Sequence, residues 1–421
     1  MSPWYTSSPY EPLRPPIENL KDIDLMDPEL YAFGDPHSAW RLLRERAPVF
    51  WHERSSPGTE NKGFWVLSRY DDCAAVYKNP KVFTSVQGPF LDLRVDQTPV
   101  RMLASLDGAE HRERRALVSR YFTPNALTRH TEAVRSVVRS LLDAVAERGA
   151  CDFSTDIASK LPLVATCELL GISPAEGQHL ADMLFAVDPN APEALQKYND
   201  AALEFFAEVI AERRRGNSRE SIADIVAHAQ LDGQPLPEHE TLHMMWILFF
   251  GGIDSTVHAA TGGLLALFHH PDQLAILRND PSLVSSAVDE ILRWTSTSHA
   301  NKRKTLQDIE IRGTLVKKDD YVSMWSPSAN RDELAFPDPF RFDVRRENKR
   351  PIATFGGGGP HHCLGQYFAR LEVQLLFEEL LKRFPDLEQA GPAVRKTHFT
   401  MLLSPVNSLP IRFAPTSRSK T

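Results

Sequence analysis

Apolar residues recur every three or four positions along most of the chain, which is the spacing of one buried helix face. The pattern predicts a helix over residues 36–46 and another over 364–384. Between them it predicts six long helical stretches, over 112–122, 124–148, 193–214, 238–270, 271–278 and 283–294. The longest, 238–270, would span roughly 50 Å at about 1.5 Å per residue, the diameter of a domain.

Strand signals are short and lie toward the two ends of the chain. Residues 48–52 and 63–67 are rich in aromatic and β-branched side chains and are joined by a polar loop, which predicts a hairpin. Short strands are expected over 309–313 and 321–325, and a closing strand pair over 401–413. These signals predict a mainly α protein with small peripheral β-sheets.

No internal repeat and no linker divides the chain, so residues 36–421 are expected to form a single domain. Residues 1–35 carry many prolines and few periodic apolar positions. They are expected to form an N-terminal arm that wraps the surface in extended form.

Composition excludes several classes of protein. Hydrophobic residues make up 42% of the 421 positions and charged residues 24%, which is ordinary for a globular chain and excludes disordered and collagen-like classes. The net charge of -7 argues against nucleic acid as a partner. Four scattered cysteines do not form a disulfide framework and favour a reducing compartment. The longest apolar run, 244–253, is too short to cross a membrane, and the N-terminus lacks a signal-peptide pattern. A cytoplasmic location is expected.

The most distinctive segment, residues 354–370, reads TFGGGGPHHCLGQYFAR. A glycine-rich backbone permits close approach of a large flat ligand. A cysteine just before a helix start is favoured as the thiolate by the helix dipole and the free N–H groups. Thiolate sulfur is one of the axial ligands that heme iron takes in proteins. The alternative interpretation of an isolated cysteine, a small buried hydrophobe, does not explain the glycines and histidines around it.

From Phe355 to Gly365 the chain resembles the heme-binding signature of the cytochrome P450 family. The resemblance implies the cytochrome P450 fold, with the long helix 238–270 over heme b (iron protoporphyrin IX). It implies that Cys363 is the axial ligand of the heme iron and that Phe355 packs on the thiolate side of the macrocycle. Gly356 belongs to the same cofactor-binding loop, and Gly365 lets the following helix lie close to the porphyrin.

Residues 251–256, GGIDST, interrupt the apolar pattern of the long helix. Each interior glycine costs about 1 kcal/mol relative to alanine, so the helix either serves a function here or breaks, with Asp254 or Ser255 capping a new one. The resemblance implies that Gly251 and Gly252 open a groove for dioxygen and that Asp254 and a neighbouring hydroxyl deliver protons. Ser255 stands where the family usually has threonine, and Thr256 follows, which puts water placement and the coupling of oxygen use to product in question.

His111 and Arg115 lie four residues apart, on one face of a predicted helix. Alone, this pattern fits a solvated surface. The resemblance implies that both pair with a heme propionate and that Arg303 and His361 are further propionate partners, with Lys302 a weaker substitute for Arg303. Charge-assisted hydrogen bonds to carboxylates suit these donors.

Glu290 and Arg293 are three residues apart on another predicted helix. Most such pairs are surface ion pairs of small energy. The resemblance implies instead that they lock the irregular segment before Cys363 together with a third arginine. The sequence leaves two candidates for that arginine, Arg341 and Arg345.

As a whole, the resemblance implies a bacterial-type heme-thiolate monooxygenase, an oxidoreductase of EC 1.14 type that serves secondary metabolism. Two electrons from outside, from a ferredoxin and its reductase, would activate O₂, and an apolar substrate of terpenoid, steroid or polyketide size would be hydroxylated. A basic patch is expected to receive the electron donor and comprises Arg112, Arg114, Arg120, Lys349, Arg350 and Arg370. The residues expected to line the substrate pocket are Phe90, Leu91, Leu93, Phe249, Phe250, Ser298, Asn301, Leu402 and Leu403.

Two alternatives stay open at this point. The same heme chemistry could end in desaturation, ring closure or peroxide-driven oxidation. Ser255 in place of threonine leaves this alternative open. A non-catalytic heme sensor is a second alternative, which the retained Asp254 and hydroxyl groups disfavour. The substrate, its site of oxidation, the redox partner and the oligomeric state are not readable from the sequence.

Overall fold

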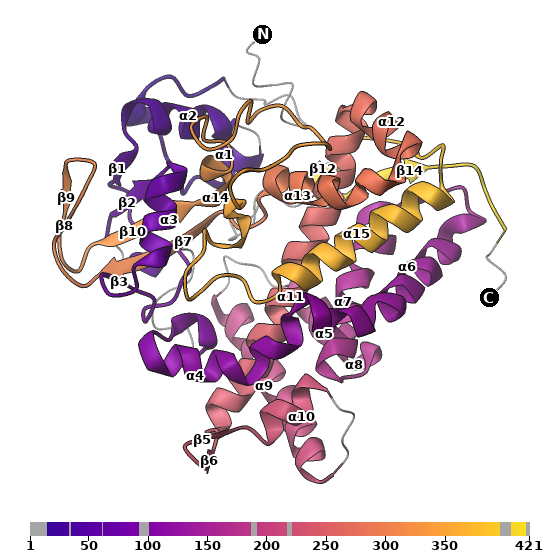
Figure 1. The fold of residues 1–421 in the computed structure, drawn as a ribbon, viewed down its shortest axis with the longest axis horizontal. Coiled ribbons are helices and arrows are strands. Elements are labelled where there is room, and N and C mark those ends of the chain that lie inside the picture. The colour runs from indigo at the N-terminus through magenta and orange to yellow at the C-terminus, as the bar shows by residue number, and fades with distance from the viewer. Residues whose placement is uncertain are drawn as a thin grey trace.

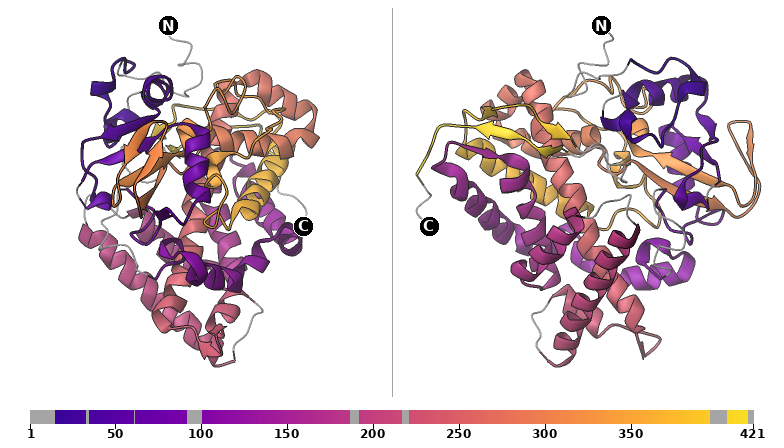
Figure 2. Two further views of the ribbon diagram at one scale, coloured as in Figure 1. Left: turned by 60° about the vertical axis from the view of Figure 1, so that its left-hand side comes forward. Right: turned by 180° about the vertical axis from the view of Figure 1, so that it is seen from behind.

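A computed structural model describes residues 15–32, 35–60, 62–91, 101–186, 192–216, 221–395 and 406–417, and the statements below concern this part of the chain. A helical region occupies one side of the molecule and a smaller region of strands and short helices the other (Figure 1). Seen from behind, the two regions again lie side by side (Figure 2). The mainly α architecture with small sheets is therefore confirmed.

Each predicted helical stretch contains a helix, and further helices lie outside those stretches, over 70–78, 160–170, 174–186 and 222–227. The stretch 112–122 ends in a 3-10 turn at 120–122, and the stretch 124–148 divides at residues 128–130 into two helices. The α-helices are α1 (Pro28–Ala32), α2 (Pro36–Arg46), α3 (Tyr70–Lys78), α4 (Gly108–Ser119), α5 (Pro124–Leu127), α6 (Thr131–Ala146), α7 (Lys160–Leu170), α8 (Pro174–Ala186), α9 (Pro192–Arg214), α10 (Ile222–Ala227), α11 (Glu238–His269), α12 (Pro271–Asn279), α13 (Val284–Thr295), α14 (Ser326–Ala329) and α15 (Gln366–Arg383).

The central helix α11 runs without a break through Gly251 and Gly252. Helices α7, α9, α13 and α15 pack around it, and this burial outweighs the helix-weakening effect of the glycines. A Cβ atom at Gly252 would lie 2.7 Å from Thr166 Oγ1 on α7, so glycine is what allows the two helices to approach here. The alternative of a helix break at this point is wrong.

None of the helices in the described residues is long and apolar enough to cross a lipid bilayer.

The largest sheet has the strand order β1-β2-β10-β7-β3. The predicted hairpin is confirmed, since β1 (Val49–His52) and β2 (Phe64–Leu67) pair in antiparallel fashion. Strand β10 (Tyr321–Trp325) runs parallel to β2 and antiparallel to β7 (Ala300–Thr305), and β3 (Phe83–Thr84) pairs with the other edge of β7. This sheet places β7, which carries Asn301 and Arg303, beside the central cavity.

The remaining sheets are small. Strands β8 (Ile309–Ile311) and β9 (Thr314–Val316) form a hairpin whose two turn residues, Arg312 and Gly313, both have positive φ. Strands β5 (Gln230–Leu231) and β6 (Gln234–Pro235) form a second hairpin.

Of the closing strand pair expected over 401–413, residues 401–405 lie outside the described residues, and the described part differs from the expectation. Strands β13 (Val406–Ser408) and β14 (Pro410–Arg412) do not pair with each other. Only Leu409 separates them, which is too short a connection for a hairpin turn. Instead, β14 lies between β11 (Glu388–Gln389) and β4 (Ala150–Asp152), and β13 pairs with β12 (Val394–Arg395).

The described part of the N-terminal arm is less extended than expected. It contains α1, and Leu25 and Tyr31 are buried in a cluster with Trp40 and Trp325. The Tyr31 hydroxyl donates a hydrogen bond of 2.8 Å to the Leu25 carbonyl. The arm is thus packed against the large sheet, whereas the division of the chain into an arm and a domain stays a prediction.

Helices α6 and α15 are joined by a cluster of charges, which makes an acid-sensitive contact. Arg135 and Arg139 donate to the carboxylate of Glu379 at 2.6 Å and 3.1 Å. Burial alone would raise the pKa of Glu379, but the hydrogen bonds from Arg139 and Arg135 outweigh it and lower that pKa. A depressed carboxyl pKa contributes stability above the unfolded-state pKa, about 4.3, and this contribution is lost as the pH falls through the folded-state value.

We therefore expect Glu379→Gln to reduce the free energy of unfolding by about 1 kcal/mol at pH 7, the net contribution of a typical hydrogen bond, because the half-exposed Arg139 is screened by solvent. The difference from the wild type should shrink as the pH falls from 6 to 3.5, measured by urea unfolding. An equal difference at both pH values would show that the charge of Glu379 does not stabilise this contact.

Candidate active site

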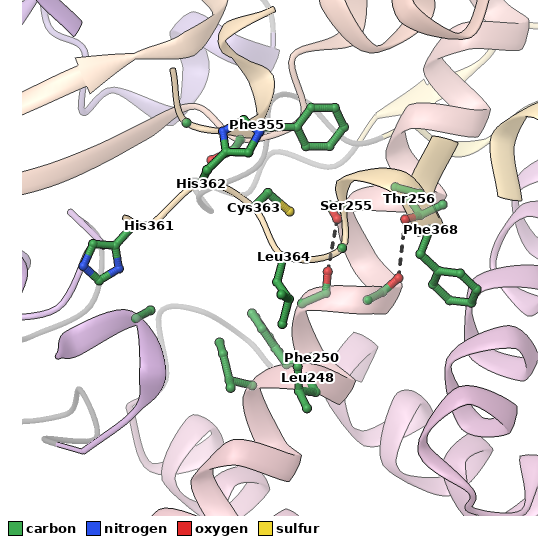
Figure 3. A pocket seen from close by; sticks show the side chains of 18 of the residues that line it. Leu248, Phe250, Ser255, Thr256, Phe355, His361, His362, Cys363, Leu364 and Phe368 are labelled. Carbon is green, nitrogen blue, oxygen red and sulfur yellow. Dashed lines mark hydrogen bonds between the residues drawn. The ribbon is translucent and has the colours of Figure 1, made fainter. Parts of the chain in front are cut away.

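A cavity of about 350 Å³ lies between α11 and the loop that precedes α15. The loop carries Phe355, His361 and Cys363, and it faces the α11 segment with Ser255 and Thr256 (Figure 3). Segments far apart in the sequence therefore meet at one cavity, including every residue of the predicted heme signature except Gly357, Gly358, Gly359 and Pro360.

The loop around Cys363 takes its shape from its glycines. Gly356, Gly357, Gly358 and Gly359 all have positive φ, which other residues rarely adopt. A Cβ atom at Gly359 would also collide with the backbone carbonyl of Tyr77 on α3. The Cys363 N–H donates a hydrogen bond of 3.0 Å to the Phe355 carbonyl, which closes the loop. The glycine run thus serves to seat the loop on α3 and to present Cys363 at the cavity.

The Cys363 thiol faces the cavity, so much of its surface is uncovered although it lies inside the fold. Burial raises its pKa, and the backbone N–H of Gly365 and the charges of Arg115 and Arg370 act in the opposite direction. The Arg370 guanidinium also lies 4.5 Å from the centre of the Phe355 ring. These donors and cations can stabilise a thiolate, which is the form that binds metal.

Four basic side chains, His111, Arg115, Arg303 and His361, line the cavity beside the loop. The rings of His111 and His361 lie 4.1 Å apart, and both ring nitrogens of His111 are buried without a hydrogen-bond partner among the described residues. Burial and the charges of His361 and Arg115 lower the pKa of His111 to about 3. Burial also lowers the pKa of Arg115 and of Arg303. Such a concentration of donors fits a ligand that carries carboxylates.

The carboxylate of Asp107 is the acid in contact with this basic cluster. It lies 3.3 Å from His361 Nε2 and accepts a hydrogen bond of 2.9 Å from the Ser85 N–H. Burial would raise the pKa of Asp107, but hydrogen bonds from His361 and Thr84 lower it to about 2. Asp107 pairs with His361, and among the described residues Arg115 and Arg303 have no carboxylate within ion-pair distance, so the cluster retains capacity for an anionic ligand.

On the opposite wall, Asp254, Ser255 and Thr256 line the cavity together with Gly251 and Gly252. The hydroxyls of Ser255 and Thr256 donate to the carbonyls of Gly251 and Gly252, each at 3.4 Å (Figure 3). Ser255 is half-buried, whereas Thr256 is buried. Both hydroxyl oxygens keep lone pairs that can accept a further hydrogen bond.

The predicted pocket lining is placed only in part. Phe90, Phe250, Ser298 and Asn301 line the cavity. Phe249 does not, because consecutive helix residues point about 100° apart, and its ring packs against Phe206 in the core instead. The predicted residues Leu93, Leu402 and Leu403 lie outside the described residues.

Leu91 is a second correction to the pocket. Its side chain is buried in the cluster that contains Phe64 and Trp325, on the sheet side of the molecule. Its carbonyl accepts a hydrogen bond of 2.8 Å from the Gly58 N–H and another from the Ser56 hydroxyl. These bonds turn residue 91 away from the cavity, which Phe90 reaches.

Sequence reasoning missed several lining residues. Ile247 and Leu248 precede Gly251 by one helical turn and share its face, so the helical period through 251 and 255 could have identified them. Tyr77, Thr166 and Glu372 come from three other helices, and no local pattern in the sequence marks them.

The buried ion pair behind the loop is built around Glu290. Arg293 donates two hydrogen bonds to its carboxylate, at 2.7 Å and 2.8 Å, and both side chains are fully buried. The third arginine is Arg346, whose Nε lies 3.0 Å from Glu290 Oε2. It approaches because the Asp343 N–H also donates to Glu290 and a turn joins Asp343 to Arg346.

Neither candidate for the third arginine that the sequence offered is correct. The Arg341 side chain is 63% exposed and lies 3.6 Å from Asp343, and Arg345 is exposed.

The expected basic patch for the electron donor is corrected at one position. Arg114 is not on the surface, because its side chain is buried and donates to Glu240 on α11. Arg112 and Arg120 of the same patch are exposed.

Comparisons with known proteins agree with this geometry. A family model described as Cytochrome P450 matches residues 180–410. The chain is 36% identical to "Cytochrome P450 NovI" of Streptomyces niveus, over 93% of this chain and 97% of that protein. It is 33% identical to "Methyl-branched lipid omega-hydroxylase" of Mycobacterium tuberculosis, over 95% of this chain and 96% of that protein.

A similar solved structure is that of the Mycobacterium marinum cytochrome P450 CYP268A2 in complex with pseudoionone. It matches with a TM-score of 0.86 and 27% identity, over 94% of this chain and 100% of that chain. The relatives and the solved structure match over more than 90% of this chain, and the family model matches residues 180–410. The chain belongs to the cytochrome P450 family of heme-thiolate oxidoreductases, which use heme b.

Proposed function

We propose that this enzyme hydroxylates an apolar organic molecule with one atom of O₂ and that Cys363 holds the heme iron. The observation that carries the proposal is the placement of a thiol and a basic cluster on one cavity, facing the acid and hydroxyls of α11. When bound, heme b supplies the activation of O₂ and the oxidation of an unactivated C–H bond.

The residues around the cavity fit that cofactor. The Cys363 thiolate would hold the heme iron, with Phe355, Gly356 and Gly365 forming the surface that would receive the macrocycle. Both ring nitrogens of His111 are buried without a partner among the described residues, and because buried polar groups are normally hydrogen-bonded, this supports a polar ligand at this position. We assign the propionate carboxylates of heme to His111, Arg115, Arg303 and His361.

The residues of α11 that line the cavity would transfer protons. Ser255 lies at the cavity and keeps lone pairs free, so it can accept a hydrogen bond from a water and pass a proton onward. Asp254, one residue earlier, is the group that can exchange protons with that hydroxyl, and Thr256 supplies a second, more buried hydroxyl. Gly251 and Gly252 leave the wall without side chains beside these groups.

The substrate is expected to be apolar and lipid-like or terpenoid in size. Phe90, Phe250, Ile247 and Leu248 give the cavity apolar walls, whereas Ser298 and Asn301 offer polar anchors. The name of the M. tuberculosis relative, a lipid hydroxylase, agrees with this chemistry. We propose that a ferredoxin and its reductase supply the electrons and that the exposed Arg112 and Arg120 contribute to docking.

The test uses the purified holoenzyme with NADH, a ferredoxin and a ferredoxin reductase. Methyl-branched fatty acids, steroids and terpenoid ketones are screened by the spectral shift that accompanies displacement of iron-bound water. For a compound that shifts the spectrum, ¹⁸O₂ should give a product with one ¹⁸O atom. A product that contains no ¹⁸O, whether desaturated or cyclised, would contradict hydroxylation and support the alternative outcome, and turnover with peroxide alone would support peroxide-driven oxidation.

A further inference from the structure

Asp254 has a basic partner on its own helix. His258 lies one turn further along α11, and its Nε2 is 3.0 Å from Asp254 Oδ1. The two side chains are 10% and 21% exposed, so the contact is shielded from bulk solvent. An acid placed four residues before a base is the favourable order for such a pair on a helix.

The two partners do not face the same surroundings. Asp254 lines the cavity, whereas His258 is not among the lining residues. Among the described residues, no basic side chain other than that of His258 lies within ion-pair distance of Asp254. On α9, burial raises the pKa of Tyr198, and the charge of Asp254 adds to that rise. The Tyr198 hydroxyl has no hydrogen-bond partner among the described residues.

We propose that His258 is a positioning residue, which holds the Asp254 carboxylate in the orientation from which it exchanges protons with Ser255. This inference rests on the proposed oxygen activation and assigns that reaction a further residue. To donate to a carboxylate, His258 must carry a proton on Nε2. Its other ring nitrogen, Nδ1, is buried and has no partner among the described residues, so the contact with Asp254 is the polar interaction that a substitution removes.

This reasoning selects the variants. His258→Gln keeps an N–H donor four residues from Asp254, whereas His258→Leu removes the donor and keeps an apolar side chain of similar reach. His243→Leu is the matched control, because His243 is also a partly buried histidine on α11 outside the cavity lining, and it lies 11 residues before Asp254.

The first measurement is structural and does not depend on turnover. Crystal structures of the wild-type holoenzyme and the three variants should show Asp254 in the same rotamer in the wild type, His258→Gln and His243→Leu. In His258→Leu the Asp254 carboxylate should leave this position. An unchanged rotamer in His258→Leu would overturn the proposal.

The second measurement is the rate of NADH-driven O₂ reduction with a ferredoxin and its reductase, in H₂O and in D₂O. His258→Leu should slow the reaction about 10- to 100-fold, the cost of a misplaced catalytic group, and should raise the solvent isotope effect. His258→Gln should stay within about threefold of the wild type, and His243→Leu should match it. A wild-type rate in His258→Leu, or a His258→Gln variant as slow as His258→Leu, would overturn the proposal. Failure of the wild type itself to reduce O₂ would count against the proposed function, and the crystal structures would still decide the role of His258.

Discussion

Replacing Cys363 by serine should reduce turnover at least a hundredfold. Loss of a partner that merely orients a metal ligand costs about 10- to 100-fold, and removal of the ligand itself should cost more. Serine preserves the size of the side chain and the loop hydrogen bond from the residue 363 N–H to the Phe355 carbonyl. The change therefore isolates the sulfur from the shape of the loop. NADH-driven O₂ reduction by the purified variant, compared with the wild type, is the measurement.

Cys151→Ser provides the matched control for that experiment. Cys151 lies in the short strand β4, does not line the cavity and is partly buried. Burial raises its pKa to about 12, so it remains a neutral thiol. Its replacement should leave turnover unchanged. Equal activity in the Cys363→Ser variant and the control would contradict a role for Cys363 as ligand.

Replacing Glu290 by alanine should lower the free energy of unfolding by about 3–5 kcal/mol, the range for breaking a buried ion pair by removing one partner. The fully buried Arg293 would lose both of its hydrogen bonds to the carboxylate, and Arg346 would lose its contact at 3.0 Å. Arg293 also donates to the carbonyls of Asn330 and Pro339, so the segment before Cys363 would loosen with it. Urea unfolding followed by circular dichroism measures the change.

A glutamate–arginine ion pair on the surface provides the control for Glu290→Ala. Glu388 and Arg412 are 58% and 62% exposed, and Glu388→Ala should change the free energy of unfolding by no more than about 1 kcal/mol. If Glu290→Ala does not accumulate as folded protein, Glu290→Gln retains the shape and removes the charge, and it should still be destabilised by more than the Glu388 variant. Similar values for the two sites would mean that burial of the Glu290 pair has little energetic effect.

The parts of the fold that the sequence predicts are those specified by local pattern. The apolar period along α11 places that helix within one residue, and the hairpin of β1 and β2 follows from aromatic and β-branched residues on either side of a polar loop. The same holds for the cavity residues that belong to contiguous motifs, such as Gly251 to Thr256 and Phe355 to Gly365. These cavity residues can be predicted because they are neighbours in the sequence.

Long-range packing decides what the sequence does not predict. Arg346 reaches Glu290 because a turn at residue 343 folds the chain back, and three arginines within six residues look alike without that turn. Phe249 and Phe250 are equally apolar, and because they point about 100° apart on α11, one packs against Phe206 of α9 and the other faces the cavity. Strand β14 finds its partners at residues 150–152 and 388–389, far away in the sequence.

The absorption spectrum of the dithionite-reduced protein under carbon monoxide tests the heme-thiolate assignment of Cys363 most directly. The wild type should show the red-shifted Soret band typical of thiolate ligation, and the Cys151→Ser control should show it as well. Cys363→Ser and Cys363→His should both lose that band. A spectrum that is the same with and without the Cys363 sulfur, or a wild-type protein that takes up no heme after supplementation, would contradict Cys363 as the ligand of the heme iron.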